Sequence, residues 1–267
     1  METYFDPELN PSPDVIYYII DKKLGDVTGD GVLDEVYLLG TISAINKVPT
    51  LFENITIALV DGRSKKTTYL RFKYNSGFNP KLLLSHFRNL NEMDMFISIE
   101  SSTEPSQFIF YLFSAVDNNP RSLFNFLAFD EYSEYSVVYT DYYNIAVTNR
   151  RTGLTFNINI GSRPKSYLTN MYNSDGKVKG IYEGDVLSLS YLTPIDLNTS
   201  GVNSLLAIQK IVGISKTDIL GYVQTFLKFN GNEFIPSSVL VAVPGRESPA
   251  SKAYKEKDNL PSRKKRK

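Results

Sequence analysis

The sequence has no cysteine and no tryptophan, and its 267 residues include a single histidine, His86. The absence of cysteine excludes disulfide frameworks, thiolate zinc sites, iron–sulfur clusters and cysteine nucleophiles. A single histidine excludes a histidine-rich metal site and leaves His86 as the one imidazole for catalysis. No apolar run approaches the roughly 18 residues of a membrane span, so we expect no membrane span.

The amino-terminal segment also lacks a secretory leader, because no basic stretch followed by an apolar core is present. This absence predicts a cytoplasmic protein. A cell or spore surface is the alternative if the chain is given without its leader. Residues 1–13 contain several prolines and are expected to form an extended lead-in to the folded body.

The formal net charge of zero hides a strong asymmetry between body and tail. Residues 246–267 carry nine basic and three acidic residues, with proline and serine and few apolar side chains. This composition predicts a disordered basic tail after a β domain that spans residues 14–245. The tail ends in a basic run that favours weak contact with nucleic acid or an anionic surface, or simply adds solubility. The run consists of Arg263, Lys264, Lys265, Arg266 and Lys267.

The body is rich in tyrosine and phenylalanine, and 13% of all residues are aromatic. Short runs of β-branched and aromatic residues alternate along it and are separated by Gly, Pro, Asn and Asp. An Asn230-Gly231 dipeptide between two such runs is typical of a hairpin. The sequence therefore predicts an all-β or mostly β fold with minor helix. Short helices are expected at Asn79–Glu92, Arg121–Tyr135 and Lys165–Tyr172.

An acidic loop between two strand-like runs is the most specific feature of the chain. Counting Asp26 as position one, oxygen-bearing side chains fall at positions one, three, five and nine, and glycine at six permits a sharp turn. This spacing wraps oxygens around a hard cation, and calcium prefers six to eight such ligands. Position twelve is Tyr37 and a strand follows, so the loop is not an EF-hand. The predicted calcium ligands are Asp26, Thr28, Asp30, the Val32 carbonyl and Asp34.

The same frame recurs twice further along the chain. The third copy keeps glycine at position six but has one carboxylate, and its candidate ligands are Asp196, Asn198, Ser200, Val202 and Ser204. A second copy runs from His86 to Asp94, where His, Arg and Leu at positions one, three and five exclude calcium. The alternative for the first loop is a polar turn in which Asp26 and Asp30 accept hydrogen bonds from their own backbone.

The first loop, followed by a hydrophobic strand, resembles the FG-GAP/VCBS repeat of integrin-like β-propellers. The body also resembles a group of uncharacterised bacterial VCBS-repeat proteins through GDVTGDGVLDEVYLLG, NITIALVDGR and LGYVQTFLKFNGNEF. The resemblance implies a small or incomplete β-propeller with calcium in its inter-strand loops and without catalytic residues. A pair of β-sandwich sheets is the alternative fold.

The chain carries no phosphate-binding loop, zinc-protease helix, dinucleotide turn or serine-hydrolase elbow. The sequence therefore favours a non-enzymatic, calcium-binding scaffold that presents a surface to a protein or glycan partner. The alternative is a hydrolase that uses Asp and Glu carboxylates on the same scaffold. Two carboxylates converging on a deep pocket would favour the hydrolase, and a flat face rich in loops would favour the scaffold.

Overall fold

The computed structural model describes residues 16–43, 50–102 and 107–245. The fold is mostly β, with two short helices, α1 (Phe126–Tyr132) and α2 (Lys165–Met171), and one 3-10 turn, η1 (Val116–Asn118). The mostly β prediction is confirmed. The predicted lead-in and the basic tail lie outside the described residues. None of the helices in the described parts is long and apolar enough to cross a membrane.

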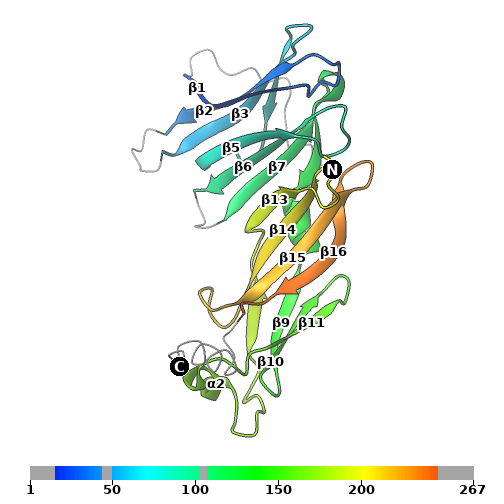
Figure 1. Ribbon diagram of the computed structural model, residues 1–267. Coiled ribbons are helices and arrows are strands. Elements are labelled where there is room, and N and C mark those ends of the chain that lie inside the picture. Colours follow the sequence, from blue (N-terminus) through cyan, green and yellow to red (C-terminus); the bar gives the residue numbers. More distant parts are fainter. Residues whose placement is uncertain (1–15, 44–49, 103–106, 246–267) are drawn as a thin grey trace, which may run out of the picture.

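The first half of the chain forms an open antiparallel sheet, at the top of Figure 1. Its strands follow the order β1-β2-β3-β5-β6-β7-β8, and β4 pairs with β3 outside this path. The strands are β1 (Tyr18–Gly25), β2 (Asp34–Ile42), β3 (Phe52–Val60), β4 (Thr67–Arg71), β5 (Gly77–Ser85), β6 (Asp94–Ser101), β7 (Phe108–Ser114) and β8 (Arg121–Asn125).

The second half forms another antiparallel sheet, in the order β11-β10-β9-β12-β14-β15-β16, with β13 paired to β14 outside the path. This sheet curls into a nearly closed seven-stranded barrel, in the lower part of Figure 1. The strands are β9 (Tyr135–Thr140), β10 (Asn144–Asn149), β11 (Thr155–Asn159), β12 (Glu183–Val186), β13 (Tyr191–Ile195), β14 (Ser204–Val212), β15 (Ile219–Phe229) and β16 (Phe234–Ala242).

Alternating side chains on the strands build three apolar clusters. In β2, Val36 and Leu38 are fully buried while Tyr37 between them is half-buried, as expected for a strand with one face on the core. One cluster lies within the open sheet and another inside the barrel. The third joins the two sheets, because it includes Phe96 of β6 and Leu205 of β14. The two halves therefore share this third cluster.

The predicted β-propeller is wrong. A propeller needs separate four-stranded sheets arranged around a central axis. In this chain one continuous ladder runs through β1, β2, β3, β5, β6, β7 and β8, and a second runs through the barrel. The β-sandwich alternative has the right number of sheets, but the second sheet nearly closes on itself.

The helix predicted at Asn79–Glu92 is also wrong, because this segment forms most of β5 and the turn after it. Its leucines alternate in exposure with a period of two: Leu82 is buried and Leu83 is 42% exposed. The segment predicted at Arg121–Tyr135 forms β8 before α1 begins at Phe126. The third predicted helix is confirmed as α2.

Candidate functional site

Three turns at equivalent places in the fold carry the repeated frame, and the predicted metal ligands belong to the first and the third. Each turn has eight residues and joins two neighbouring antiparallel strands: β1 to β2, β5 to β6 and β13 to β14. In each case position one of the frame is the first residue after a strand, and position nine begins the next strand. We call them turn 1 (residues 26–33), turn 2 (residues 86–93) and turn 3 (residues 196–203). The internal repeat read from the sequence is thus a repeated hairpin.

In turn 1, Asp26 folds the backbone around its own carboxylate. Its Oδ1 accepts hydrogen bonds from the amides of Gly29 (2.7 Å) and Asp30 (3.2 Å), and its Oδ2 accepts one from Gly31 (2.8 Å). Asp30 Oδ1 in turn accepts the amide of Val32 at 2.8 Å. Gly31 has a φ of +83°, a conformation that glycine adopts without strain.

Turn 3 repeats this arrangement. Asp196 Oδ1 accepts the amides of Asn198 (3.2 Å) and Ser200 (3.1 Å), and its Oδ2 accepts that of Gly201 at 2.7 Å. These bonds, led by the one from Gly201, lower the pKa of Asp196. The Ser200 hydroxyl accepts the amide of Val202 at 3.3 Å, as Asp30 does with Val32 in turn 1. Ser204 lies in β14, opposite Ile195.

The aspartates at position nine of turns 1 and 2 point into the protein. Asp34 is fully buried, and its Oδ2 accepts the amides of Val27 and Thr28, each at 2.9 Å. Its Oδ1 accepts the amide of Gly62 at 2.8 Å, which ties turn 1 to the turn between β3 and β4. Asp94, also fully buried, takes the same position in turn 2. These two carboxylates act as internal anchors for their turns.

Guanidinium groups supply positive charge beside both turns. Arg63 reaches turn 1 from the turn after β3, with its Nε 2.5 Å from Asp30 Oδ2 and its Nη2 2.7 Å from the Asp30 carbonyl. In turn 2, Arg88 lies 2.8 Å from Asp94 Oδ1 and 3.0 Å from Glu92 Oε1. Burial raises the pKa of Asp94 to about 6, although Arg88 opposes this shift.

The predicted calcium ligands do not converge on one point. Asp26 and Asp34 direct their oxygens to backbone amides, and Asp30 pairs with Arg63. Across the described residues, no three Asp, Glu or His side chains are placed to hold a metal ion. Thr28 is buried. Its amide donates a hydrogen bond to the Asp34 carboxylate, and its carbonyl accepts one from the Asp117 amide. The donor set in this arrangement does not fit calcium without rotation of the Asp26 and Asp30 carboxylates.

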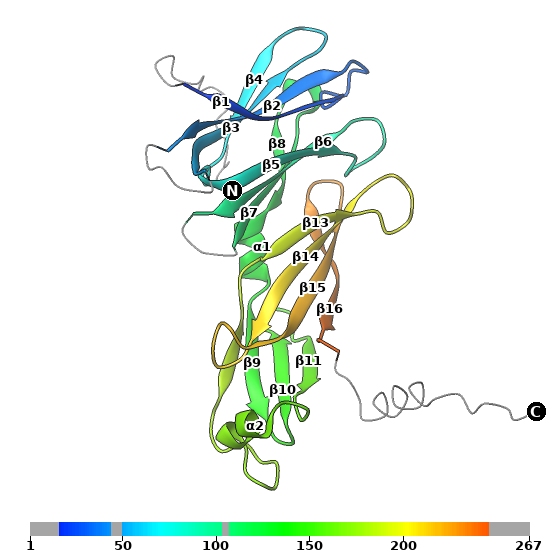
Figure 2. The same cartoon turned by 60° about the vertical axis from the view of Figure 1, so that its left-hand side comes forward.

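The three turns form a row held together by a repeated hydrogen bond. The amide of Met93, position eight of turn 2, donates to the carbonyl of Asp26, position one of turn 1, at 2.7 Å. The amide of Asn203, position eight of turn 3, donates to the carbonyl of His86, position one of turn 2, at 2.8 Å. Figure 2 shows all three turns on one side of the molecule. We call this surface the turn row.

Asp61 and Asn118 fix the neighbouring turn, and reasoning from sequence missed the contact between these two residues. Asp61 is buried and accepts hydrogen bonds from the amides of Arg63 and Ser64 and from Asn118 Nδ2. These bonds, led by that from the Ser64 amide, hold the pKa of Asp61 well below its usual range. The Asp-Gly pair after a strand is a common turn motif, but it gives no signal for Asn118, which lies 57 positions further along the chain.

The single histidine has a structural place in turn 2. His86 Nδ1 lies 3.0 Å from the carbonyl oxygen of Glu92, across the same turn. The basic run Arg263–Lys267 lies outside the described residues.

Comparison with known proteins decides the family. The chain is 35% identical to "Uncharacterized protein YybI" of Bacillus subtilis (strain 168) over 231 residues, which are 86% of each chain. The chain belongs to the YybI family. A family model described as "YybI C-terminal domain" matches residues 133–242, which contain every strand of the barrel. No solved structure matches.

Membership of the YybI family corrects the FG-GAP/VCBS resemblance. The aspartate- and glycine-rich turn that suggested this resemblance is a local motif. An aspartate at position one and a glycine at position six favour a tight turn of this kind in unrelated folds. The motif therefore identified the turn and not the family.

Proposed function

We propose that this YybI-family protein is a non-enzymatic scaffold that binds a protein partner through the turn row. The observation that supports the proposal is the repeated hydrogen bond from position eight of one turn to position one of the preceding turn. Backbone bonds hold the three turns in a fixed order, so the backbone that carries their side chains is ordered before a partner binds. Such preorganisation reduces the entropy lost on association.

The chemistry of the turn row suits a protein partner. Each turn exposes one leucine among polar residues: Leu33 is 64% exposed, Leu90 59% and Leu197 45%. A Cβ placed at Gly201 would lie 3.1 Å from Leu90, so turns 2 and 3 share a continuous surface. Apolar contacts surrounded by polar groups are typical of protein interfaces. A glycan, the other class of partner expected from the sequence, has no comparable support.

The hydrolase alternative needs two carboxylates that face one cavity. Two hollows of the described structure lie along the barrel, with volumes of about 540 and 250 Å³. Neither is lined by Asp, Glu or His. No observation therefore favours the hydrolase over the scaffold.

Calcium is not needed for this proposal. Arg63 and Arg88 already place positive charge beside the carboxylates of turns 1 and 2. Calcium at turn 1 remains a prediction of the sequence, and its ion would have to displace Arg63 from Asp30. The weaker prediction at turn 3 depends on Asp196 alone for negative charge.

Site-specific photo-crosslinking tests the scaffold. A photoreactive amino acid is placed singly at Leu33, Leu90 or Leu197 in the cells that produce the protein. The exposed Lys228, on β15, is the matched control. We expect the three turn-row positions to yield the same discrete crosslinked protein and Lys228 to yield none. Crosslinks at Lys228 alone, or at none of the positions, would overturn the proposal.

A further inference from the structure

The barrel is open along one seam, between its end strands β11 and β16. Each neighbouring pair from β11 to β16 is antiparallel, so these two end strands run in the same direction. No ladder joins them among the described strands. A strand inserted between them would be antiparallel to both and would complete an eight-stranded antiparallel barrel.

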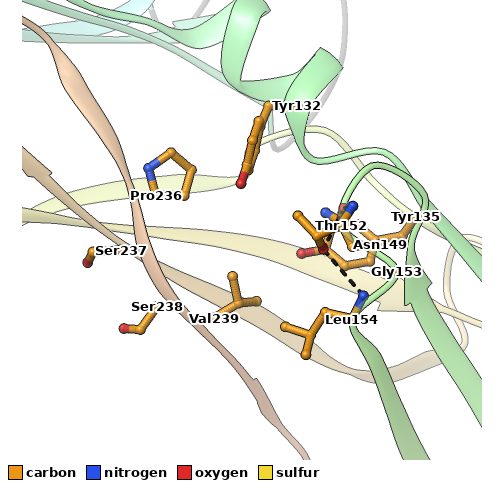
Figure 3. A pocket seen from close by; sticks show the side chains of 10 residues that line it. All are labelled: Tyr132, Tyr135, Asn149, Thr152, Gly153, Leu154, Pro236, Ser237, Ser238 and Val239. Carbon is orange, nitrogen blue, oxygen red and sulfur yellow. Dashed lines mark hydrogen bonds between the residues drawn. The ribbon is translucent and has the colours of Figure 1, made fainter.

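Two hollows mark the two ends of this seam. One, of about 540 Å³, is lined by residues around the start of β11 and by Pro236–Val239 of β16. Figure 3 shows Leu154, Val239 and Tyr132 pointing into the space between the two sides. The other hollow, of about 250 Å³, lies where Ile158–Ile160 face Val243 and Pro244. The seam is therefore about as long as an extended segment of five to seven residues at about 3.3 Å per residue.

The facing backbone of β11 is available for pairing. On either side of β11, the Asn149 amide donates to the Leu154 carbonyl, and the Ile160 amide donates to the Tyr143 carbonyl. In the register of this ladder, the even-numbered residues of β11 therefore form the hydrogen bonds with β10. In an antiparallel ladder the alternate residues direct their amides and carbonyls to the other side. Thr155, Asn157 and Asn159 thus direct theirs toward the seam.

Beyond Pro236 and a β-bulge at the start of β16, neither edge strand carries the protection usual for exposed edges. β11 (TFNIN) and β16 (FIPSSVLVA) contain no charged residue. Pro236 interrupts only the start of β16, and the following Ser238–Ala242 are small or apolar. Long uncharged edges readily add a further strand unless they are covered.

From this geometry we infer that the seam accepts one uncharged, extended segment of a protein partner as the missing strand. A second copy of the chain pairing through β16 would leave the β11 edge uncovered. The chain's own residues 246–267 carry nine basic and three acidic residues and two prolines, which suit neither two uncharged edge strands nor two ladders. The partner segment needs alternating apolar residues, because one of its faces would meet the barrel core, which includes Val239 and Ile158.

A capped peptide with the sequence of Asn144–Asn149 is a suitable probe, because β10 is the natural antiparallel neighbour of β11. Its binding to the full chain is measured by fluorescence anisotropy against a scrambled peptide. Two further peptides carry N-methyl groups, one at Ile145 and Val147 and the other at Ala146 and Thr148. We expect saturable binding of the parent peptide only, because a strand between two edges uses both sets of amides. Binding that survives either methylation would mean pairing with one edge and would overturn the inference.

A protein variant gives an independent test. Asn157→Pro removes an amide that faces the seam and leaves the β10 ladder intact, and Asn157→Ala keeps that amide. We expect about tenfold weaker binding for the proline variant and unchanged binding for the alanine variant. Equal binding by both would contradict the inference, and the methylated peptides decide if the proline variant fails to fold.

Two outcomes would assign the seam to another occupant. Binding that arises only after residues 246–267 are deleted would assign it to the tail. A dimer in sedimentation equilibrium that the peptide dissociates would assign it to a second copy. Either result would overturn the inference of a partner strand and leave the turn-row proposal intact.

Discussion

Replacing Asp34 by alanine should destabilise the protein far more than replacing Asp26. Each carboxylate accepts three backbone amides. Two of the donors to Asp34, the amides of Val27 and Thr28, belong to buried residues, so water cannot replace the lost acceptor. A buried donor left without a partner costs about 1–3 kcal/mol. We therefore expect Asp34→Ala to lower the free energy of unfolding by about 3–5 kcal/mol.

The Asp26 variant is the matched control. Two of its donors belong to exposed glycines, Gly29 and Gly31, whose amides water can reach. We expect Asp26→Ala to cost about 0.5–1.5 kcal/mol, the net value of an ordinary hydrogen bond. Guanidinium denaturation followed by circular dichroism measures both, with the slope against denaturant unchanged. Equal losses for the two variants would refute the role of burial in this reasoning.

Four other predictions concern turn 1, turn 2 and the tail. Burial raises the pKa of Asp94 from its usual 3.8 to about 6. The neutral form therefore contributes stability that is fully present below about pH 4 and is lost as pH rises through 6. Asp94→Asn should remove this loss in melting curves from pH 4 to 7, and an unchanged pH slope would contradict it. Calcium should raise the melting temperature of Arg63→Ala more than that of the wild type, because the variant lacks the guanidinium that pairs with Asp30. Identical melting curves in calcium and in chelator for both proteins would refute the calcium prediction. Gly62→Ala should destabilise in thermal melts, because its Cβ would lie 2.1 Å from the Leu33 carbonyl oxygen, and an unchanged melting temperature would show that the turn can shift. Deleting residues 246–267 should change the melting temperature by about a degree or less, and a larger drop would mean that the tail packs on the body.

The turns were the part of the fold that the sequence predicted best. Asp26 and Asp196 at position one, with Gly31 and Gly201 at position six, set the backbone through interactions within six residues. The Asn230-Gly231 hairpin between β15 and β16 was equally local, and Gly231 has the positive φ expected there. Such contacts depend on near neighbours in the chain, so spacing alone identifies them.

The charge partners of the turns could not be predicted in the same way. Asp30 meets Arg63 because β2 pairs with β3, which brings together residues 33 positions apart. Without that pairing, three aspartates in one loop suggested an unbalanced negative charge and hence a cation. In the sequence, Arg88 at position three of turn 2 indicates only that a calcium ligand is missing there. The structure shows that it bridges Asp94 and Glu92.

The unequal spacing of the three turns follows from the topology. The first residues of turns 1 and 2 are 60 positions apart, and those of turns 2 and 3 are 110 apart. Between turns 2 and 3 the chain also builds β9 to β12, which are four of the seven strands of the barrel, before β13 and β14 form the third hairpin. The bond from Asn203 to His86 nevertheless places turn 3 against turn 2 as Met93 places turn 2 against turn 1. Because this contact spans the long insertion, the barrel must fold in a way that returns the third hairpin to the row. The turn row therefore links the two halves of the molecule through backbone bonds, beside their shared apolar core.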